Sequence, residues 1–476
     1  MMPAKLQAYS STFFLASICL ALVAPSLFSD GMFMDGLIYA AVSKNMAEGL
    51  GTFWQPHLSQ TLYSEFFQHP PLALGLQAFA FKFFGSSFLI ERFYSLFTFL
   101  LSGFLITKIW KQLDKPATSA WIPLLFWFLN PLVIWAVANN MLENTMQIFV
   151  LFSVWSLLKF TRNEKFYWLL LAGFSLFLGL LTKGFVALFP LSFFFWLWLF
   201  QKKTSFFKAS FHTGILFLAT ILPLLILLIS NSSAHHSLYS YLNIQVITSL
   251  TKVQTVDSRF FILFRWMNES LISFGILLLI FILNRKKIAD FKKTFSEDKK
   301  LIFLFFAIGF SGVLPIMISL KQSGFYMLSA FPFFAIGFAL LAYPFLVRQR
   351  NLIQLPTSIH KYLGITSFLL FFVVLFFGLL FFKNKVDRDQ EQLHDVYAIS
   401  KYVGKDKLIA IPQSLAQAWS LHAYFARYAT ISLDDVNTKP RVYFLSTKGE
   451  IPPNPDAYQE IELDLQRYSL FKTRQP

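Results

Sequence analysis

Asp30-Gly31-Met32-Phe33-Met34-Asp35-Gly36-Leu37-Ile38-Tyr39 follows the first apolar segment of the chain, and Glu65-Phe66-Phe67-Gln68-His69-Pro70-Pro71-Leu72 lies further along the same connection. Both stretches belong to residues 30–85, which are too many and too patterned for a simple link between two membrane helices. Their apolar and aromatic content is not that of a disordered segment. Because acids, a histidine and aromatic residues gather here beside a membrane segment, we interpret residues 30–85 as part of a functional site.

The composition predicts a protein that crosses a membrane several times. Hydrophobic residues make up 56% of the 476 residues and charged residues only 14%, whereas a soluble protein carries roughly a quarter charged residues. A bilayer-spanning helix needs about 20 predominantly apolar residues. Eleven segments are candidates: 11–29, 86–107, 119–137, 141–158, 166–182, 184–200, 209–230, 267–283, 301–319, 325–346 and 362–382.

Basic residues gather in every second connection between these segments. The connections hold Lys108, Lys111 and Lys115, then Lys159, Arg162 and Lys165, then Lys202, Lys203 and Lys208, then Arg285, Lys286, Lys287, Lys292 and Lys293, and finally Arg348, Arg350 and Lys361. Cytoplasmic loops carry such an excess of positive charge, so the N-terminus with Lys5 is predicted to be cytoplasmic. The pattern explains much of the net charge of +16 without a nucleic-acid partner.

The same alternation places residues 30–85, 231–266 and the tail from 383 on the opposite side. Ala24-Pro25-Ser26 is a poor signal-peptidase site because of its proline, so we expect the first span to remain as an anchor. The single cysteine, Cys19, can form neither an intrachain disulfide nor a cysteine-based metal site.

Two domains are predicted. Residues 1–382 form a helical transmembrane domain, whose outer loop contains amphipathic segments at 35–48 and 71–83 that fit helices in the interface plane. Residues 383–476 are more polar and alternate between strand-like runs at 407–411 and 441–445 and a helical pattern near 414–427. This alternation predicts a small soluble α/β domain outside the membrane.

Few ionisable residues lie at the outer ends of the predicted spans, so each can be weighed. Asp35 heads a helical segment and is a candidate general base, with helix capping as the alternative. Glu143 begins a span on the same side, where the alternative is a favourable interaction with the helix dipole. Lys183 lies between two apolar spans, where an ammonium without a partner is costly unless it reaches the membrane surface.

Further candidates come from three other outer segments. Lys321 and Tyr326 enter a span from the outer side, and cations there could hold a phosphate group. His69 precedes two prolines that enforce an extended turn. Two adjacent histidines, His235 and His236, could bind a metal ion, with polar filling of a serine-rich loop as the alternative.

The ordered set of motifs resembles the membrane glycosyltransferases of the GT-C fold. The branch most similar contains the aminoarabinose transferases of lipid A and the dolichyl-phosphate-mannose protein mannosyltransferases. The resemblance runs over residues 10–345 and rests on Asp35-Gly36-Leu37-Ile38-Tyr39-Ala40, Phe67-Gln68-His69-Pro70-Pro71-Leu72, Leu181-Thr182-Lys183-Gly184, and the stretch from Lys321 to Phe334.

The resemblance implies roles for individual residues. Asp35 would be the catalytic carboxylate and Glu143 the second acid of the outer face. Lys183 and Tyr326 would line the donor cavity, and His69 would take the place of a phosphate-contacting Lys. We further expect Tyr39, Arg259, Arg265 and Lys321 to bind the donor or its phosphate.

This sequence also departs from its relatives. The family often has Asp-Glu where Asp35-Gly36 stands, and the aminoarabinose transferases have Arg in place of Ile38 and Lys in place of His69. These departures argue against aminoarabinose transfer to lipid A specifically. Arg259, Arg265 and Lys321 are the candidates to replace the missing cations.

The predicted function is an inverting transfer of a sugar from a polyprenyl-phosphate donor to a hydroxyl or phosphate of an acceptor, which would be a glycolipid, lipid A or a protein. The scheme requires no cofactor, although two acids and the two histidines leave a divalent metal open. The alternative is a polytopic lipid or solute transporter or flippase, for which internal repeats and interrupted midplane helices would be expected. Residue usage typical of bacteria predicts an inner-membrane protein with a periplasmic site and C-terminal domain.

Overall fold

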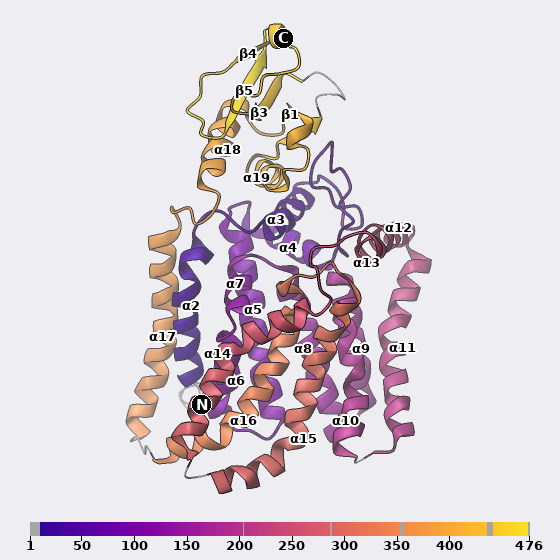
Figure 1. The fold of residues 1–476 in the computed structure, drawn as a ribbon, viewed down its shortest axis with the longest axis vertical. Coiled ribbons are helices and arrows are strands. Elements are labelled where there is room, and N and C mark those ends of the chain that lie inside the picture. Colours follow the sequence, from indigo (N-terminus) through magenta and orange to yellow (C-terminus); the bar gives the residue numbers. More distant parts are fainter. Residues whose placement is uncertain (1–9, 203, 286–287, 353–356, 436–440, 475–476) are drawn as a thin grey trace.

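Long apolar helices form a bundle, and a smaller unit stands on one end of it in the computed structural model (Figure 1). The structure describes residues 10–202, 204–285, 288–352, 357–435 and 441–474. Within these ranges, eight helices are long and apolar enough to cross a membrane. The prediction of a polytopic helical membrane protein with a small external α/β unit is therefore confirmed.

The spanning segments follow the predicted order. The helices are α2 (Ser10–Phe28), α5 (Leu89–Gln112), α8 (Leu142–Asn163), α9 (Phe166–Lys183), α10 (Phe193–Gln201) after η2 (Phe185–Ser192), α11 (Phe206–Ser230), α14 (Phe261–Leu283), α15 (Ile288–Val313), α16 (Phe331–Leu352) and α17 (Thr357–Phe382). Two of the eleven predicted spans, at 141–158 and 184–200, correspond to α8 and to η2–α10. Both lie in the bundle but are not among the eight helices that are long and apolar enough to cross a membrane.

The predicted span at 119–137 is broken rather than straight. It consists of α6 (Trp121–Phe128), preceded by η1 (Ala117–Ser119), and α7 (Pro131–Ala138), and the two parts meet at 85°. Pro131 cannot continue the hydrogen-bond ladder of a helix. Asn130 ends the first part and caps the second, because its side chain accepts hydrogen bonds from the backbone N–H groups of Leu132 and Val133.

The outer connection forms two helices with different surroundings. The helix α4 (Leu72–Phe84) exposes large apolar side chains, including Phe79 and Phe83, as expected for a helix at a membrane interface. The helix α3 (Met34–Ala47) is instead covered by protein. Its residues Leu37, Ala41 and Val42 share a hydrophobic core with the C-terminal unit. The interfacial position predicted for both segments therefore fits α4 alone.

A five-stranded sheet forms the C-terminal unit, with strand order β2-β1-β3-β5-β4. The strands are β1 (Leu408–Ile411), β2 (Ser432–Asp435), β3 (Tyr443–Thr447), β4 (Tyr458–Glu460) and β5 (Tyr468–Thr473). β1 pairs in parallel with β2 and β3, and β5 is antiparallel to β3 and β4. The helices α18 (Gln390–Val403) and α19 (Trp419–Ala429) complete the predicted α/β pattern, and α19 packs on α3.

Short helices lie beside α3 and cover the end of the bundle that carries the C-terminal unit, which is called here the outer end. They are α12 (Ser232–Tyr241), the π-helical η3 (Leu242–Ile247) and α13 (Thr248–Thr251), and they face η5 (Leu314–Ile318) and η6 (Gly324–Ala330). The connections rich in basic residues lie at the opposite end of the bundle (Figure 1). Lys5, Lys203 and the side chains of Lys286, Lys287, Lys292, Lys293, Arg348, Arg350 and Lys361 lie outside the described residues.

Candidate functional site

Asp35 lies in the first turn of α3, directly outside the membrane bundle. Phe33 occupies the cap position and no side chain caps the helix, so Asp35 does not have the capping role considered as its alternative. The backbone N–H of Phe33 donates to Oδ1 of Asn139 over 2.9 Å. A Cβ atom at Gly36 would overlap the carbonyl oxygen of Asn139. These contacts hold the start of α3 against the end of α7. They thereby fix the position of the half-buried Asp35.

Glu143 and Lys183 form an ion pair inside the protein. Glu143 begins α8 and is 0% exposed, whereas Lys183 ends α9 and is 7% exposed. The Lys183 ammonium also lies 5.5 Å and 5.7 Å from the ring centres of Phe325 and Tyr326. Lys183 thus does not extend to the membrane surface. Its charge is held by a carboxylate and two aromatic faces, which is how buried cations are commonly stabilised.

Lys321 reaches the same region from the segment between η5 and η6. Its ammonium donates to Oγ of Ser249 over 3.2 Å, and Oγ of Ser319 donates to the carbonyl of Ser249 over 2.7 Å. Tyr241 donates through its hydroxyl to the carbonyl of Lys183 over 3.4 Å. The segment α12–α13 is therefore attached to both lysine-bearing segments.

His69 and Tyr39 form a pair at the wall of this region. The Tyr39 hydroxyl and Nε2 of His69 are 3.0 Å apart, and their rings meet edge to face. Burial and the charges of Lys183 and Lys321 lower the pKa of His69 well below its usual value. His69 is therefore neutral near pH 7 and offers a hydrogen bond rather than a positive charge.

These residues surround a cavity of about 200 Å³, called here the Lys183 pocket. Its lining combines polar groups with apolar side chains: His69, Glu143, Lys183, Val186, Tyr241, Gln245, Val246, Ser249, Leu250, Pro315, Ile316, Ser319, Lys321 and Tyr326. Five of the residues singled out in the sequence (His69, Glu143, Lys183, Lys321 and Tyr326) thus line one cavity, although they come from separate segments of the chain.

The electrostatic surroundings of Asp35 connect it to this pocket. Burial raises the pKa of Asp35, and the positive charges of Lys183 and Lys321 partly oppose that rise. Burial likewise lowers the pKa of Lys321, which the charge of Asp35 opposes and that of Lys183 reinforces. Asp35 therefore lies within electrostatic reach of both lysines, although it is not among the residues that line the pocket.

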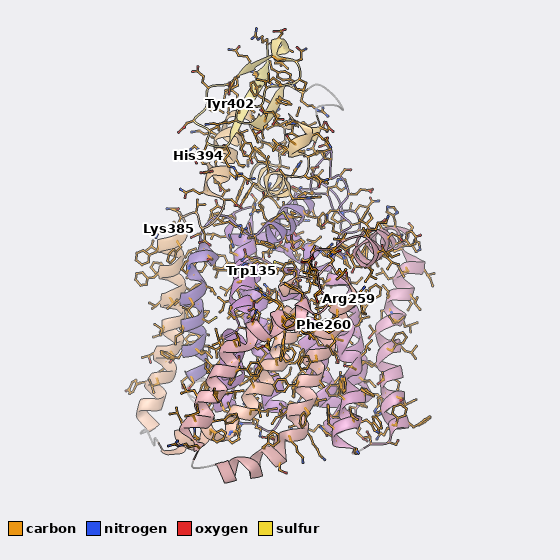
Figure 2. The ribbon with its side chains drawn as sticks, in the orientation of Figure 1. Trp135, Arg259, Phe260, Lys385, His394 and Tyr402 are labelled. Carbon is orange, nitrogen blue, oxygen red and sulfur yellow. The ribbon has the colours of Figure 1, made fainter. Side chains whose placement is uncertain are left out.

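Two predicted donor-binding residues lie apart from the cluster. Arg259 is exposed and donates to the carbonyls of Met317 and Ile318 at the end of η5. Arg265 is partly exposed and pairs at 2.6 Å with the buried Glu269, one turn further along α14. Neither lines the Lys183 pocket, and Figure 2 shows Arg259 beside the labelled Phe260 near the outer end of the bundle.

The two adjacent histidines have aromatic neighbours. The His235 ring stacks on Tyr239, and His236 meets Phe67 edge to face. In the described parts of the chain, no three His, Cys, Asp or Glu side chains group as metal ligands.

Sequence reasoning did not identify Tyr241 and Ser249 as parts of the pocket. Both lie in the connection 231–266, which was expected on the side opposite to the basic connections. Tyrosine and serine in such a loop carry no distinctive pattern, so their role depends on the packing of α12–α13 against η5.

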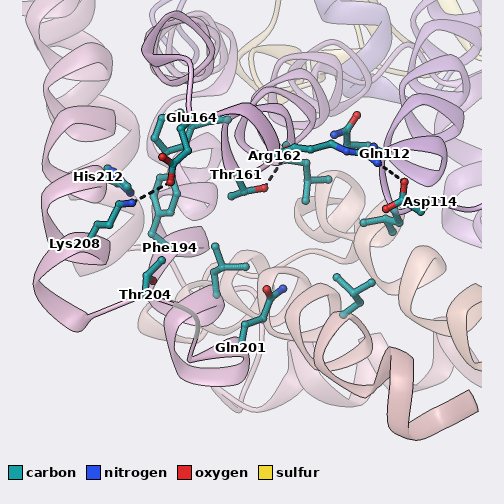
Figure 3. Close-up of a pocket in the computed structure, with 15 residues that line it drawn as sticks. Gln112, Asp114, Thr161, Arg162, Glu164, Phe194, Gln201, Thr204, Lys208 and His212 are labelled. Atoms are coloured by element: carbon teal, nitrogen blue, oxygen red, sulfur yellow. Dashed lines mark hydrogen bonds and ion pairs between the residues drawn. The ribbon is translucent and has the colours of Figure 1, made fainter. Parts of the chain in front are cut away.

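Another cavity, of about 300 Å³, opens at the opposite, basic end of the bundle (Figure 3). Its charged side chains pair with one another: Lys208 with Glu164 at 3.0 Å and Arg162 with Asp114 at 2.5 Å. None of the predicted site residues lines this cavity, so we take the Lys183 pocket as the candidate site.

Comparisons with known proteins agree with this architecture. The family model for dolichyl-phosphate-mannose-protein mannosyltransferase matches residues 68–227, which include His69, Glu143 and Lys183. No protein with a curated description matches the chain.

Solved structures resemble the chain over nearly its whole length. The structure of ArnT from Cupriavidus metallidurans bound to undecaprenyl phosphate has a TM-score of 0.65 and 12% identity, with 98% of both chains covered. Its apo form has a TM-score of 0.63 and 13% identity, with 96% of both chains covered. The apo oligosaccharyltransferase of Archaeoglobus fulgidus has a TM-score of 0.50 and 11% identity, covering 92% of this chain and 70% of the other.

The architecture therefore defines a multi-pass membrane protein with an external domain above a polar site. More particularly, the chain has the GT-C fold of membrane glycosyltransferases, as the sequence resemblance predicted.

Proposed function

We propose that the protein is an inverting glycosyltransferase that takes its sugar from a polyprenyl-phosphate donor at the extracytoplasmic face of the membrane. The observation that carries the proposal is the gathering of His69, Glu143, Lys183, Lys321 and Tyr326 around one partly apolar pocket. Asp35 lies near enough for the charges of both lysines to act on its carboxyl group. A carboxylate can accept a proton there while two cations face an anionic group. The similarity to a GT-C structure that holds undecaprenyl phosphate supports a donor of this chemical class.

The lining of the Lys183 pocket suits the donor. Lysines bind phosphate through charge-assisted hydrogen bonds, and Lys321 is held by Ser249 through a single, replaceable hydrogen bond. Val186, Leu250 and Ile316 supply apolar surface next to these cations. The segment α12–α13 exposes three large apolar residues, Ile244, Ile247 and Leu250. Their exposure suits contact with the hydrocarbon chain of a lipid or with the bilayer.

The proposed reaction assigns each group one task. The acceptor O–H attacks the anomeric carbon, and its proton passes to Asp35. A C–O bond to the acceptor forms as the bond between the anomeric carbon and the phosphate oxygen breaks. Lys183 and Lys321 stabilise the negative charge on the departing polyprenyl phosphate, a type of electrostatic stabilisation that is often the largest catalytic contribution. No proton has to be supplied to this leaving group.

The roles of Glu143, Tyr39 and Tyr326 follow from their contacts. Glu143 holds the Lys183 ammonium at the pocket, and Tyr326 packs beside that ammonium. Tyr39 orients the neutral His69, which can donate one hydrogen bond to the donor. We place these residues in positioning roles and keep Asp35 as the group that takes part in proton transfer.

The test is turnover of a radiolabelled polyprenyl-phosphate sugar pool by purified protein in lipid nanodiscs. Replacing Asp35 by Asn removes the base with little change in shape, and we expect transfer to fall about 10²- to 10⁴-fold while donor binding remains. The matched control is Asp257→Asn, which changes an exposed acid on the same side of the bundle and should leave transfer unchanged. Equal activity of Asp35→Asn and wild type would remove Asp35 from the reaction.

A separate binding measurement tests the donor assignment. We expect Lys321→Gln to weaken binding of polyprenyl phosphate to nanodisc-embedded protein about 10- to 100-fold, because a hydrogen bond to a charged group contributes roughly 1.5–3 kcal/mol. Lys252→Gln, at an exposed lysine that ends α13, is the control. Unchanged affinity in Lys321→Gln, or no binding by wild type, would contradict the donor assignment.

A further inference from the structure

A second cavity, of about 230 Å³, lies beside the start of α3 and is called here the Trp135 cavity. None of its lining residues lines the Lys183 pocket. Three aromatic rings connect the two: Trp135 lines the second cavity, Phe325 lies below the Lys183 ammonium, and Phe33 contacts both rings at 5.0 Å and 6.0 Å. Asp35 follows Phe33 by two positions at the start of α3, so the ring that lies between the two cavities and the proposed base belong to one short segment.

The polar part of the Trp135 cavity lies beside Phe33. Gly31, Met32 and Asn139 line it from below the start of α3, and Asp387 and Arg388 line it from the link between α17 and α18. A Cβ atom at Gly31 would overlap the backbone of Arg388, so the link passes directly over Gly31. This close approach brings the Arg388 guanidinium to 5.7 Å from the Phe33 ring centre.

Several of these polar groups have hydrogen-bonding capacity to spare. Within the described ranges, the indole N–H of Trp135 has no hydrogen-bond partner, and the one ion pair of Arg388 runs from Nε to Asp389 at 3.6 Å. An indole ring with an unused N–H, together with the Asp387 carboxylate and the Arg388 guanidinium, suits a sugar ring. The C–H face of a sugar packs on an aromatic ring, and its hydroxyls pair with donors and acceptors in the same plane.

The apolar part of the cavity points to a ligand anchored in the membrane. Leu22, Val23 and Ser26 of the spanning helix α2 line it, together with Ile134 and Ala138 of α7. Leu22 is 67% exposed and lies on a helix that spans the bilayer. The cavity therefore has lipid-facing residues at one edge and polar residues at the other. Figure 2 shows Trp135 near the outer end of the bundle, below the C-terminal unit.

We propose that the Trp135 cavity binds the sugar head group of a lipid-linked glycan, which is the acceptor. The glycan's hydrocarbon anchor lies along α2, and one sugar hydroxyl is presented to Asp35. That hydroxyl loses its proton to Asp35 as its oxygen bonds to the anomeric carbon and the donor's phosphate departs. The inference rests on the proposed function, because only a transferase needs an acceptor at Asp35.

Photo-crosslinking tests the occupant without requiring catalysis. The photoreactive residue p-benzoylphenylalanine replaces Leu22 in the full chain, and lipids attached to the protein in native membranes are identified by mass spectrometry. The matched control places the same residue at Phe14, which is exposed on the same helix but outside the cavity. We expect a sugar-bearing lipid attached at position 22 and no such attachment at position 14.

Two variants then test the polar contacts. Arg388→Gln and Trp135→Phe each remove one hydrogen-bonding group, and each should lower the yield of attached glycolipid about fivefold. Trp135→Phe retains an aromatic ring beside Phe33 and Phe325, so a loss in this variant reports on the indole N–H rather than on ring packing. Unchanged yields in both variants would overturn the assignment of the polar groups.

The identity of the crosslinked molecule shows which ligand occupies the Trp135 cavity. Phospholipid alone at both positions, a peptide at position 22, or a polyprenyl-phosphate sugar at position 22 would each overturn the proposal. Failure of polyprenyl phosphate to bind at Lys321, with the glycolipid still attached at position 22, would instead remove the proposed function and leave the Trp135 cavity as a glycolipid site. The two failures are therefore distinguishable.

Discussion

At the scale of single residues, the role of base that we propose for Asp35 is supported by two opposing influences on its carboxyl group. Burial raises its pKa, which makes it a stronger proton acceptor, whereas Lys183 and Lys321 lower the pKa and preserve the ionised form. A general base is most effective when its pKa lies close to the operating pH. The lysines therefore serve both substrates in the proposed reaction: they face the donor phosphate and they adjust the acidity of the group that deprotonates the acceptor.

This coupling predicts a shift in the pH dependence of the reaction. Asp35 must be ionised to accept a proton, so kcat/KM falls as the pH drops through its pKa. Because the charge of Lys321 lowers that pKa, Lys321→Gln should raise it and move the acidic limb of the profile to higher pH. The measurement is kcat/KM against pH for wild type, Lys321→Gln and the control Lys252→Gln.

The position of the limb separates two effects of the Lys321 substitution. Weaker donor binding lowers kcat/KM at every pH, whereas the electrostatic effect moves the limb. A limb that stays in place or moves to lower pH in Lys321→Gln would contradict the coupling between Lys321 and Asp35.

At the scale of helices and strands, much of the fold follows from local sequence. Apolar length predicts the spans, and the alternation in the tail predicts β1, α19 and β3. The break between Phe128 and Pro131 was also accessible, since the proline is visible in the sequence. The burial of α3 was not, because its Ala- and Leu-containing pattern suits a membrane interface as well as a protein core. Only the packing of α19 on α3 distinguishes these environments.

The start of α3 offers a prediction at this scale. Gly36→Ala places a methyl group against the carbonyl of Asn139, so the first turn of α3 must move and Asp35 with it. A displacement of about 1 Å at a reacting group can cost on the order of 10²-fold in rate. We expect a loss of that size in kcat with donor affinity nearly unchanged, measured with the radiolabelled donor and by binding of polyprenyl phosphate.

Gly214→Ala is the matched control for this substitution, because a methyl group there meets no atom within 4 Å and alanine favours a helix more than glycine does. Gly214→Ala should therefore retain full activity. Full activity of Gly36→Ala would show that the contact with Asn139 does not determine the position of Asp35.

At the scale of the whole molecule, contacts between distant residues decide the site, and these lie beyond sequence reasoning. Arg427 of α19 forms two hydrogen bonds with Glu91 of α5, at 3.0 Å and 2.7 Å, and both residues are 1% exposed. Tyr397 and Tyr428 donate to the carboxylate of Asp30. No local pattern distinguishes these side chains from ordinary surface residues. Conversely, Arg259 and Arg265 were predicted from the sequence to bind the donor because they are cations near the outer end, yet neither lines the pocket.

The pair of Arg427 and Glu91 predicts how the C-terminal unit contributes to catalysis. Arg427→Met leaves the Glu91 carboxylate buried without its partner, and breaking a buried pair in this way costs about 3–5 kcal/mol. Because α19 packs on α3, we expect lower thermal stability together with a reduced kcat. The double variant Glu91→Gln with Arg427→Met removes the unpaired charge and should recover part of the stability.

Arg162→Gln, which breaks the exposed pair with Asp114 at the opposite end of the bundle, should change neither quantity appreciably. If Arg427→Met lowers the melting temperature while kcat stays at the wild-type value, the external unit stabilises the protein without positioning Asp35. A fall in both, with partial recovery of both in the double variant, means that the unit above the membrane holds the reacting carboxylate in place.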